Sequence, residues 1–354
     1  MADLDLDFAI VDAHIHQWDP RTTPRRASPL TRLLGWWPAL YVGVARRLFP
    51  RPIREFVGVP ENALFPYLPA DHARDVAPLS VDTVVHVEAG WMEPGPLGPV
   101  GETRWVDSLD FGATKRLGAI VAHANLRAPD ADALLAAHVA ASPRVRGVRQ
   151  MGAWHPDAGV FPWARKPGLY RDADFLRGFE RLAARGLRFD AWVYSHQLSD
   201  VTELAARFPE AQIVLDHLGT PVGAAGRYAA TGATAAERGR IAGAWREGLA
   251  GLAEKKNVVA KLSGLAMPVL GFDFHRRSQP PGAPELVERL GPFIRHGLDV
   301  FGVERCFFAS NFPMDKASAP FERLFAAYLE LARERGPDAP RALLRDNALR
   351  AYAV

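Results

Sequence analysis

Residues 188–217, RFDAWVYSHQLSDVTELAARFPEAQIVLDH, decide the fold class, because they contain a complete strand–helix–strand pattern. Apolar and β-branched runs at 188–194 and 211–217 flank a segment at 198–209 whose apolar residues repeat with helical spacing. Two strands that are joined through a helix pair in parallel, since the helix returns the chain to the starting end of the sheet. The stretch therefore predicts a parallel α/β sheet covered by helices.

The same alternation of strand and helix continues along the chain in both directions. Six further runs have strand character, at 8–13, 82–89, 117–124, 145–150, 257–263 and 305–310. Helical spacing recurs between and after them, for example at 130–141, 173–186 and 320–336. Eight strands favour a closed (β/α)₈ barrel of the TIM type, and no dinucleotide fingerprint follows the first strand. We expect one barrel domain over residues 1–354.

Three long segments interrupt the barrel pattern. They follow strands one, four and seven, at 17–80, 152–170 and 264–284. Each comes after the carboxyl end of a strand, which is the end where barrel enzymes build their sites. We therefore interpret them as pocket walls or lids, with a lid or subunit contact at about 20–75. They are rich in tryptophan, which suits a covered organic pocket: Trp18, Trp36, Trp37, Trp154 and Trp163.

Composition limits the class of protein. The 354 residues are 48% hydrophobic and 23% charged, as in an ordinary globular protein, which excludes a disordered or coiled-coil chain. A net charge of +3 predicts no nucleic-acid partner. The single cysteine, Cys306, excludes a disulfide framework and a cysteine-based zinc site, and we expect it to be buried. No signal peptide or apolar span of about 20 residues is visible, so we expect a cytoplasmic protein without a membrane partner. A homo-oligomer stays open.

The strongest chemical signal is the histidine pair in Asp12-Ala13-His14-Ile15-His16 at the end of the first strand. Side chains two positions apart on a strand point to the same face, so both rings should face the barrel mouth. Two imidazoles in this arrangement can hold a divalent metal ion or hydrogen-bond a substrate carbonyl. We expect one zinc or manganese ion as a possible cofactor, and metal-free activity is the alternative.

Other candidates end later strands. His196 follows strand five and His217 ends strand six, and we expect both to face the same mouth. Arg149 ends strand four, where a buried guanidinium needs an anionic partner. That partner is a substrate carboxylate in the functional interpretation, and a structural acid such as Glu88 in the alternative.

The last strand is followed by Ser310, Asn311 and Asp315. Asp315 is the only acid in this turn, and a carboxylate there could take a proton from water as a general base. The competing interpretation makes Asp315 a cap of the following turn or helix.

Several of these stretches together resemble the amidohydrolase superfamily, in its lactonase-containing branch of barrel-fold metal-dependent hydrolases. The matching segments lie between about 10 and 315, in strand order: VDAHIHQWDP, VVHVEAGW, GETRWV, VRGVRQ, WVYSHQLSDVTELAARFPEAQIVLDHLGTP and CFFASNFPMD. The resemblance implies a distorted barrel that hydrolyses a carbonyl compound. Relatives in this branch open sugar lactones or lactone acids from aromatic breakdown, some with a metal and at least one without.

The resemblance also assigns roles to residues of this chain. His14 and His16 match the first-strand pair, His196 and His217 match the histidines of strands five and six, and Arg149 is similar to a basic residue that grips a substrate carboxylate. One position departs from the pattern. The superfamily usually ends strand eight with an aspartate, and this chain has Asn311, whose amide cannot act as a base.

We therefore expect a hydrolase that opens a small carboxylate-bearing lactone by water attack on the carbonyl. The expected catalytic residues are Asp315, His196 and His217. Substrate would contact Arg149, Asn311, Glu88 and Trp18, and a metal would bind His14, His16 and His217. Two alternatives stay open. One is metal-dependent, non-oxidative decarboxylation of an aromatic acid, and the other is a barrel that binds a small acid without turnover, which Asn311 favours.

Overall fold

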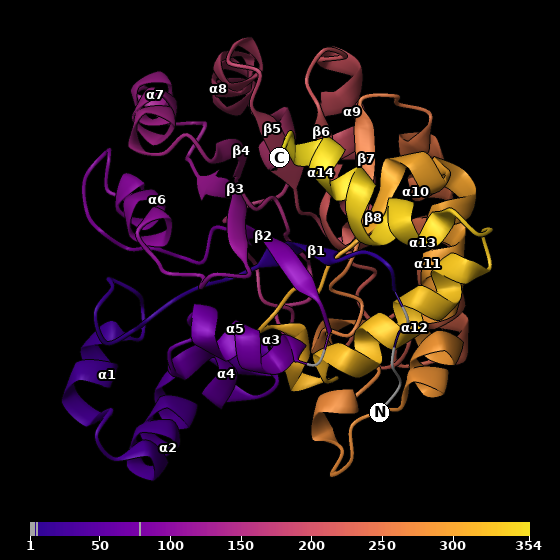
Figure 1. The fold of residues 1–354 in the computed structure, drawn as a ribbon, viewed down its shortest axis with the longest axis horizontal. Helices are drawn as coiled ribbons and strands as arrows, with labels where there is room; N and C mark the ends of the chain where they lie inside the picture. The colour runs from indigo at the N-terminus through magenta and orange to yellow at the C-terminus, as the bar shows by residue number, and fades with distance from the viewer. Residues whose placement is uncertain (1–3, 5, 78) are drawn as a thin grey trace.

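Eight parallel strands form the centre of the protein, and they follow one another around the sheet in sequence order (Figure 1). The computed structural model describes residues 4, 6–77 and 79–354. An isolated parallel bridge joins Ile15 to Phe312 just beyond the last strand, so the sheet nearly closes on itself. This architecture confirms the predicted TIM-like barrel. The strands are β1 (Ile10–Ile15), β2 (Val81–Val87), β3 (Arg116–His123), β4 (Val145–Arg149), β5 (Arg188–Ala191), β6 (Ile213–Leu215), β7 (Val258–Leu262) and β8 (Cys306–Phe308).

Helices cover the outside of the barrel and pack on the strands through apolar stripes. The stripe of α8, for example, consists of the buried Phe175, Phe179 and Leu182, and the Asp172 side chain caps its first turn. The helices after β2 are α6 (Val100–Asp107), α7 (Ala131–Ala141), α8 (Ala173–Ala184), α9 (Leu198–Arg207), α10 (Ala235–Ala253), α11 (Ala283–Phe301), α12 (Phe321–Arg333), α13 (Ala339–Arg341) and α14 (Asn347–Tyr352).

Five short helices lie between β1 and β2 and extend to one side of the barrel (Figure 1). They are α1 (Ser28–Leu34), α2 (Pro38–Leu48), α3 (Arg51–Val57), α4 (Pro60–Leu64) and α5 (Pro69–Val76). Two of the tryptophans in this segment do not cover a pocket. Trp36 and Trp37 are 85% and 62% exposed, because they lie in the turn between α1 and α2.

A bulge in β1 decides which side chains face the barrel interior. From Asp12 to Ile15 the strand advances three residues, while its partner β2 advances two, from Val84 to His86. One extra residue in a strand reverses the alternation of its side chains. Val11 and Ala13 therefore pack in the interior cluster with Tyr352 of α14, and His14 beyond the bulge also contacts interior side chains.

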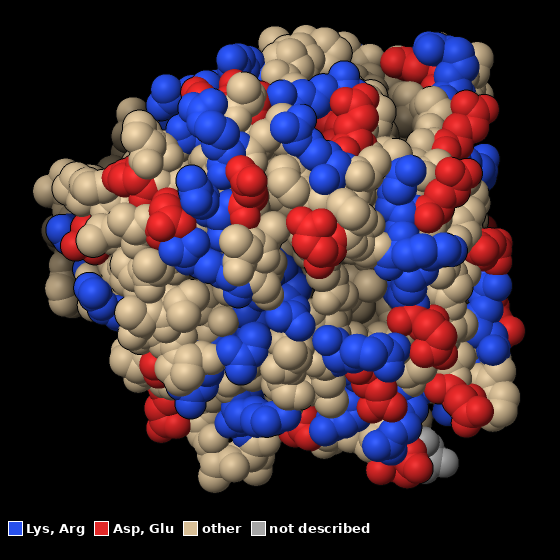
Figure 2. Space-filling model, turned by 90° about the horizontal axis from the view of Figure 1, so that it is seen from above, with Lys and Arg blue, Asp and Glu red and all other residues tan. Residues whose placement is uncertain are grey.

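Charged side chains of both signs are interspersed on the face shown in Figure 2. No helix in the described part of the chain combines the length and the apolar character that crossing a membrane requires. Cys306 is buried on β8 as expected, and burial raises the pKa of its thiol to about 12. A thiol in this setting is a packing group and not a nucleophile.

Candidate active site

A cavity of about 490 Å³ opens at the carboxyl ends of the strands. Its floor carries the polar side chains of His16, Glu88, Arg149, His217 and Asn311, all of which are buried. Trp18 forms part of one wall, and its indole nitrogen donates to the Phe65 carbonyl at 2.9 Å. The remaining wall and roof come from α2, α3 and the segments after β2, β4 and β7, including Phe56, Trp91, Trp163 and Met267. Five of the residues predicted for substrate or catalysis thus share one cavity with His16, which was predicted as a metal ligand.

The two histidines at the end of β1, His14 and His16, point at each other. Their Nε2 atoms are 3.2 Å apart, and His16 Nδ1 lies 2.8 Å from the Val87 carbonyl oxygen. A carbonyl only accepts, so Nδ1 of His16 carries the proton and Nε2 keeps a lone pair. Burial, followed by the positive charges of Lys261 near His14 and Arg149 near His16, holds the pKa of each ring well below its usual value. Both imidazoles are therefore neutral at neutral pH.

His217 is held at the end of β6 by an uncommon backbone conformation. Its φ is 56°, in the left-handed region that few residues other than glycine adopt. Nδ1 of the ring lies 2.9 Å from Ser263 Oγ, and a Cβ atom on Gly264 would come within 2.4 Å of the ring. Burial lowers the pKa of His217 to about 3. Glycine is thus the only residue type at position 264 that lets the chain after β7 pass this close to the neutral ring of His217.

Arg149 lines the cavity, but two acids of this chain already neutralise it. Its Nε donates to Glu88 Oε1 at 2.9 Å, and one terminal nitrogen donates to Asp216 Oδ2 at 3.3 Å. The other terminal nitrogen donates to the Glu88 carbonyl oxygen at 3.0 Å. Burial opposes the charge of Arg149, but Glu88 and Asp216 outweigh it and raise the pKa of the guanidinium. The structural partner Glu88 is therefore present, and this arginine does not require a substrate carboxylate.

Lys261 and its two carboxylate partners were missed from the sequence. Lys261 Nζ is fully buried inside the barrel, 2.8 Å from Asp190 Oδ2, 2.9 Å from Asp216 Oδ1 and 3.1 Å from His14 Nδ1. The Tyr352 hydroxyl also donates to Asp190 at 2.6 Å. Burial raises the pKa of Asp190 to about 6 despite Lys261, whereas Lys261 and His14 overcome burial at Asp216 and lower its pKa. The signal in the sequence was a single lysine within the apolar run VVAKL.

Asp315 does not reach the cavity. Its carboxylate is fully buried behind Asn311, where it accepts a hydrogen bond from Asn311 Nδ2 at 2.9 Å and from the Ala266 amide at 3.3 Å. Asn311, which has a φ of 57°, lies on the floor of the cavity instead. The geometry favours Asp315 as the residue that orients Asn311, and leaves it without contact to a water molecule in the cavity.

His196 does not join the other histidines. The chain turns into a short 3₁₀ helix at Ser195–Gln197 directly after the β5 region, and this turn carries the side chain outward. The residue is exposed, and its ring packs edge-on against His155 at 5.1 Å. The expectation that four imidazoles converge is therefore wrong for His196, because strand ends alone do not specify the direction of the following turn.

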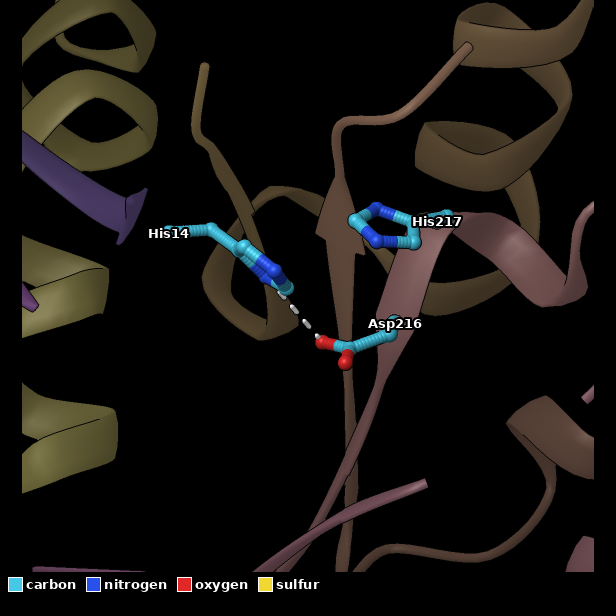
Figure 3. A group of neighbouring side chains, drawn as sticks. All are labelled: His14, Asp216 and His217. Carbon is cyan, nitrogen blue, oxygen red and sulfur yellow. Dashed lines mark ion pairs between the residues drawn. The ribbon is translucent and has the colours of Figure 1, made fainter. Parts of the chain in front are cut away.

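Three side chains form a buried group that could hold a metal ion: His14, Asp216 and His217 (Figure 3). One donor atom from each lies within 4.8 Å of the others. His14 Nδ1 is 3.5 Å from Asp216 Oδ1, as the dashed line in Figure 3 marks. Two neutral imidazoles and an ionised carboxylate are a donor set that suits zinc. The group contains Asp216 in place of the expected His16.

The raised pKa of Asp315 predicts how the stability of the folded protein depends on pH. Burial raises this pKa from 3.8 to about 7, against the opposing hydrogen bonds from Asn311 and Ala266. The folded protein then binds more protons than the unfolded chain between these values, so its stability falls as the pH rises from about 4 to about 7. Between these pH values, the unfolding free energy of Asp315→Asn should fall less steeply than that of the parent protein, by up to about 1.4 kcal/mol per pH unit. Urea unfolding at several pH values measures the difference.

The exposed Asp338→Asn serves as the control for this measurement, because its carboxyl group is in solvent. Its unfolding free energy should follow the parent protein at every pH. A pH slope that is the same in Asp315→Asn and in the parent would contradict the shifted pKa of Asp315.

Three known proteins are similar to this chain in sequence. Protein y4mH of Sinorhizobium fredii is 29% identical over 351 residues, which cover 98% of this chain and 99% of that protein. L-fucono-1,5-lactonase of Burkholderia multivorans is 29% identical over 286 residues, which cover 80% of this chain and 87% of the enzyme. An L-fucono-1,5-lactonase of Burkholderia ambifaria is 29% identical over 258 residues, 72% of this chain and 76% of that enzyme.

Solved structures show the same fold. A crystal structure of an amidohydrolase from Burkholderia multivorans with bound HEPES has a TM-score of 0.70 at 25% identity and covers 98% of this chain and all of that one. A second crystal form of an amidohydrolase from the same organism, with bound zinc, has a TM-score of 0.68 at 26% identity and the same coverage. The amidohydrolase family model matches residues 11–354. Because that match spans nearly the whole chain, the protein belongs to the amidohydrolase family.

Proposed function

We propose that the protein hydrolyses the ester bond of a carboxylate-bearing lactone and releases the open-chain hydroxy acid. The observation that carries the proposal is the meeting of two neutral imidazoles, His16 and His217, with Arg149 at the floor of one cavity. The neutral ring of His14 lies within 4.9 Å of both imidazoles, measured between ring centres. Two relatives at 29% identity are named L-fucono-1,5-lactonases, which supports the lactone class.

His16 is the general base of this proposal. Its Nε2, which lies 3.2 Å from His14 Nε2, keeps a lone pair because Nδ1 donates to the Val87 carbonyl, and its ring lines the cavity. Nε2 takes a proton from water while the water oxygen bonds to the lactone carbonyl carbon. The carbon–oxygen bond of the ring then breaks, and the alkoxide that leaves receives the proton. Asp315, the base expected from the sequence, is too far behind Asn311 to act in this way.

Arg149 and Asn311 bind the carbonyl oxygen of the substrate. Both lie on the cavity floor, and the guanidinium keeps its charge because its pKa is raised. A fixed positive charge in a buried site stabilises the negative charge that develops on the carbonyl oxygen. Glu88 and Asp216 hold the guanidinium in place, so it needs little reorganisation when the charge develops.

A divalent cation, zinc or manganese, would be held by His14, Asp216 and His217. The pKa values of His14, His217 and Asp216 are all lowered. Both imidazoles are therefore neutral and the carboxylate is ionised, which are the forms that bind metal. When bound, such an ion supplies Lewis-acid polarisation of a carbonyl. A related amidohydrolase structure contains zinc, which supports this assignment.

The proposal is tested by titrating acid release from a panel of lactones. We expect ring opening with no loss of CO₂, about one equivalent of metal in the purified protein, and a loss of turnover of about 100-fold or more after chelation. Asp216→Asn should lose the metal, whereas the remote His196→Gln should retain it. CO₂ release would indicate the decarboxylase alternative, and binding without any product would indicate the non-catalytic one. Full turnover after chelation would contradict a catalytic role for the cation. Arg149 would then polarise the substrate carbonyl without a metal.

A further inference from the structure

The lining of the cavity is apolar and cationic, with few neutral hydrogen-bonding groups. Among the described residues it contains five arginines and a single acid, Glu88, which is paired with Arg149. Asn311 is its only neutral amide, and it has no serine, threonine, tyrosine or glutamine. The indole nitrogens of Trp18, Trp91 and Trp192 already donate to other groups of the protein, and only that of Trp163 lacks a partner among the tryptophans of the lining.

This lining does not suit a polyhydroxylated ring. Each hydroxyl that leaves water needs a partner, and an unpaired buried polar group costs about 1–3 kcal/mol. A sugar lactone would bring several hydroxyls into a cavity whose neutral polar side chains, apart from the imidazoles of His16 and His217, are Asn311 and the Trp163 indole. An apolar body, aryl or alkyl, fits this lining better than a sugar ring, although two relatives are named for a sugar lactone.

Two aromatic walls lead outward from the reacting groups. On one side Trp18 stacks on His16 with ring centres 6.3 Å apart. On the other side Trp192 lies 5.7 Å from His217 and is followed by Trp163 and Phe56 at 5.4 and 5.2 Å between successive ring centres. Phe56 belongs to α3, so the apolar path extends from the histidines to the helices that follow β1.

Three arginines of the lining form no ion pair among the described residues: Arg26, which is exposed, and the partly buried Arg25 and Arg54. Glu88 and Glu102 are the acids nearest to Arg25, and neither forms an ion pair with it. The Arg25 guanidinium lies 4.8 Å above the Trp18 ring and makes no ion pair, and Arg54 has a buried Nε without an acceptor. Arg149 and Arg46, which also line the cavity, are paired with Glu88 and Glu61. A buried guanidinium without a counter-charge is costly, so the positions of Arg25 and Arg54 are suited to an anionic group of a ligand.

We infer that the substrate is an amphipathic lactone. Its lactone ring lies at His16 and His217, its apolar body lies between the walls of Trp18 and Trp192, and a carboxylate carried by that body binds Arg25 and Arg54. This inference rests on the proposed hydrolysis and adds the shape and charge of the substrate to it. The carboxylate site thereby moves from Arg149, which the sequence favoured, to residues of the segment after β1.

The test compares substrates that differ in one feature. The first is 3,4-dihydrocoumarin extended by an alkyl chain that ends in a carboxylate, the second is its methyl ester, and the third is L-fucono-1,5-lactone. We expect kcat/KM to be at least about 10-fold higher for the carboxylate than for the ester, since a charge-assisted hydrogen bond is lost in the ester. Arg25→Gln and Arg54→Gln should each bring this ratio toward one. Arg47→Gln is the matched control, because Arg47 is an exposed residue of α2 outside the cavity.

A higher kcat/KM for L-fucono-1,5-lactone than for both dihydrocoumarins would overturn the inference, as would an unchanged carboxylate-to-ester ratio in both variants. Calorimetric binding of 6-phenylhexanoate, which cannot be hydrolysed, separates the two proposals. If no lactone is opened but this acid binds the parent at least about 10-fold more tightly than Arg25→Gln and Arg54→Gln, the hydrolase proposal fails and the cavity assignment is supported. If lactones are opened with no dependence on these arginines, only the assignment of the substrate carboxylate to Arg25 and Arg54 fails.

Discussion

Replacing His16 by glutamine is expected to lower kcat for lactone ring opening by about 10²- to 10⁴-fold, the usual contribution of a positioned general base. The substitution removes the Nε2 lone pair, while the glutamine side chain occupies much of the same space. His16 is buried and its tautomer is set by the Val87 carbonyl, so the lost group is a defined proton acceptor. The rate is measured by titration of the acid that forms.

His196→Gln is the matched control, since this histidine is exposed and packs on His155 away from the cavity. It should retain the parental kcat. A pH profile adds a second criterion. The pKa of His16 is held well below 6.5 by burial and by Arg149, so the base stays deprotonated and kcat/KM should stay level as the pH falls from 8 to 6.5. A His16→Gln protein with parental turnover would eliminate the proposed base.

The exchange Lys261→Met should lower the free energy of unfolding by about 3–5 kcal/mol, the cost of removing one partner from a buried ion pair. Methionine has a similar length but no charge. Asp190 and Asp216 would then share the barrel interior without the ammonium that lies within 2.9 Å of both. We also expect turnover to fall, because His14 loses its 3.1 Å contact with Lys261. Denaturant unfolding at pH 7.5 provides the measurement.

A double variant distinguishes charge from packing. Adding Asp190→Asn to Lys261→Met removes one of the two stranded carboxylates, so the pair of changes should cost less than Lys261→Met alone. Tyr352→Phe removes only the hydroxyl that donates to Asp190, and should cost about 0.5–3 kcal/mol. If the double variant is less stable than Lys261→Met, Lys261 does not stabilise the fold by neutralising the buried carboxylates.

The strand series of the barrel could be predicted because its signals are local. Each strand is a short β-branched run followed by a helical segment, as in residues 188–217, and the observed β5, α9 and β6 lie inside those predicted bounds. His14, His16 and His217 were found for the same reason, since parallel strands in a barrel bring their carboxyl ends to one mouth. The predicted orientation of the His196 side chain was wrong, because a 3₁₀ turn at Ser195–Gln197 follows the strand.

The charges inside the barrel depend on contacts that no local pattern specifies. Lys261 lies 71 positions from Asp190 and 45 from Asp216, yet its ammonium contacts both. The sequence showed only one polar residue in an apolar strand, whose partners depend on the register of β5, β6 and β7. The same holds for Asp315, whose position behind Asn311 decides that it orients an amide and does not face water.

The sequence by itself determined the barrel, its strand order and the chemical character of its mouth, because hydrophobic periodicity and residue type act over a few neighbouring positions. Only the tertiary structure decided which charged groups neutralise one another and which remain free for a ligand. Arg149 is paired with Glu88 across 61 positions, whereas Arg25 and Arg54 form no ion pair among the described residues. Coulomb energies depend on distance and burial in space, and both arise only when the strands and the helices after β1 pack together.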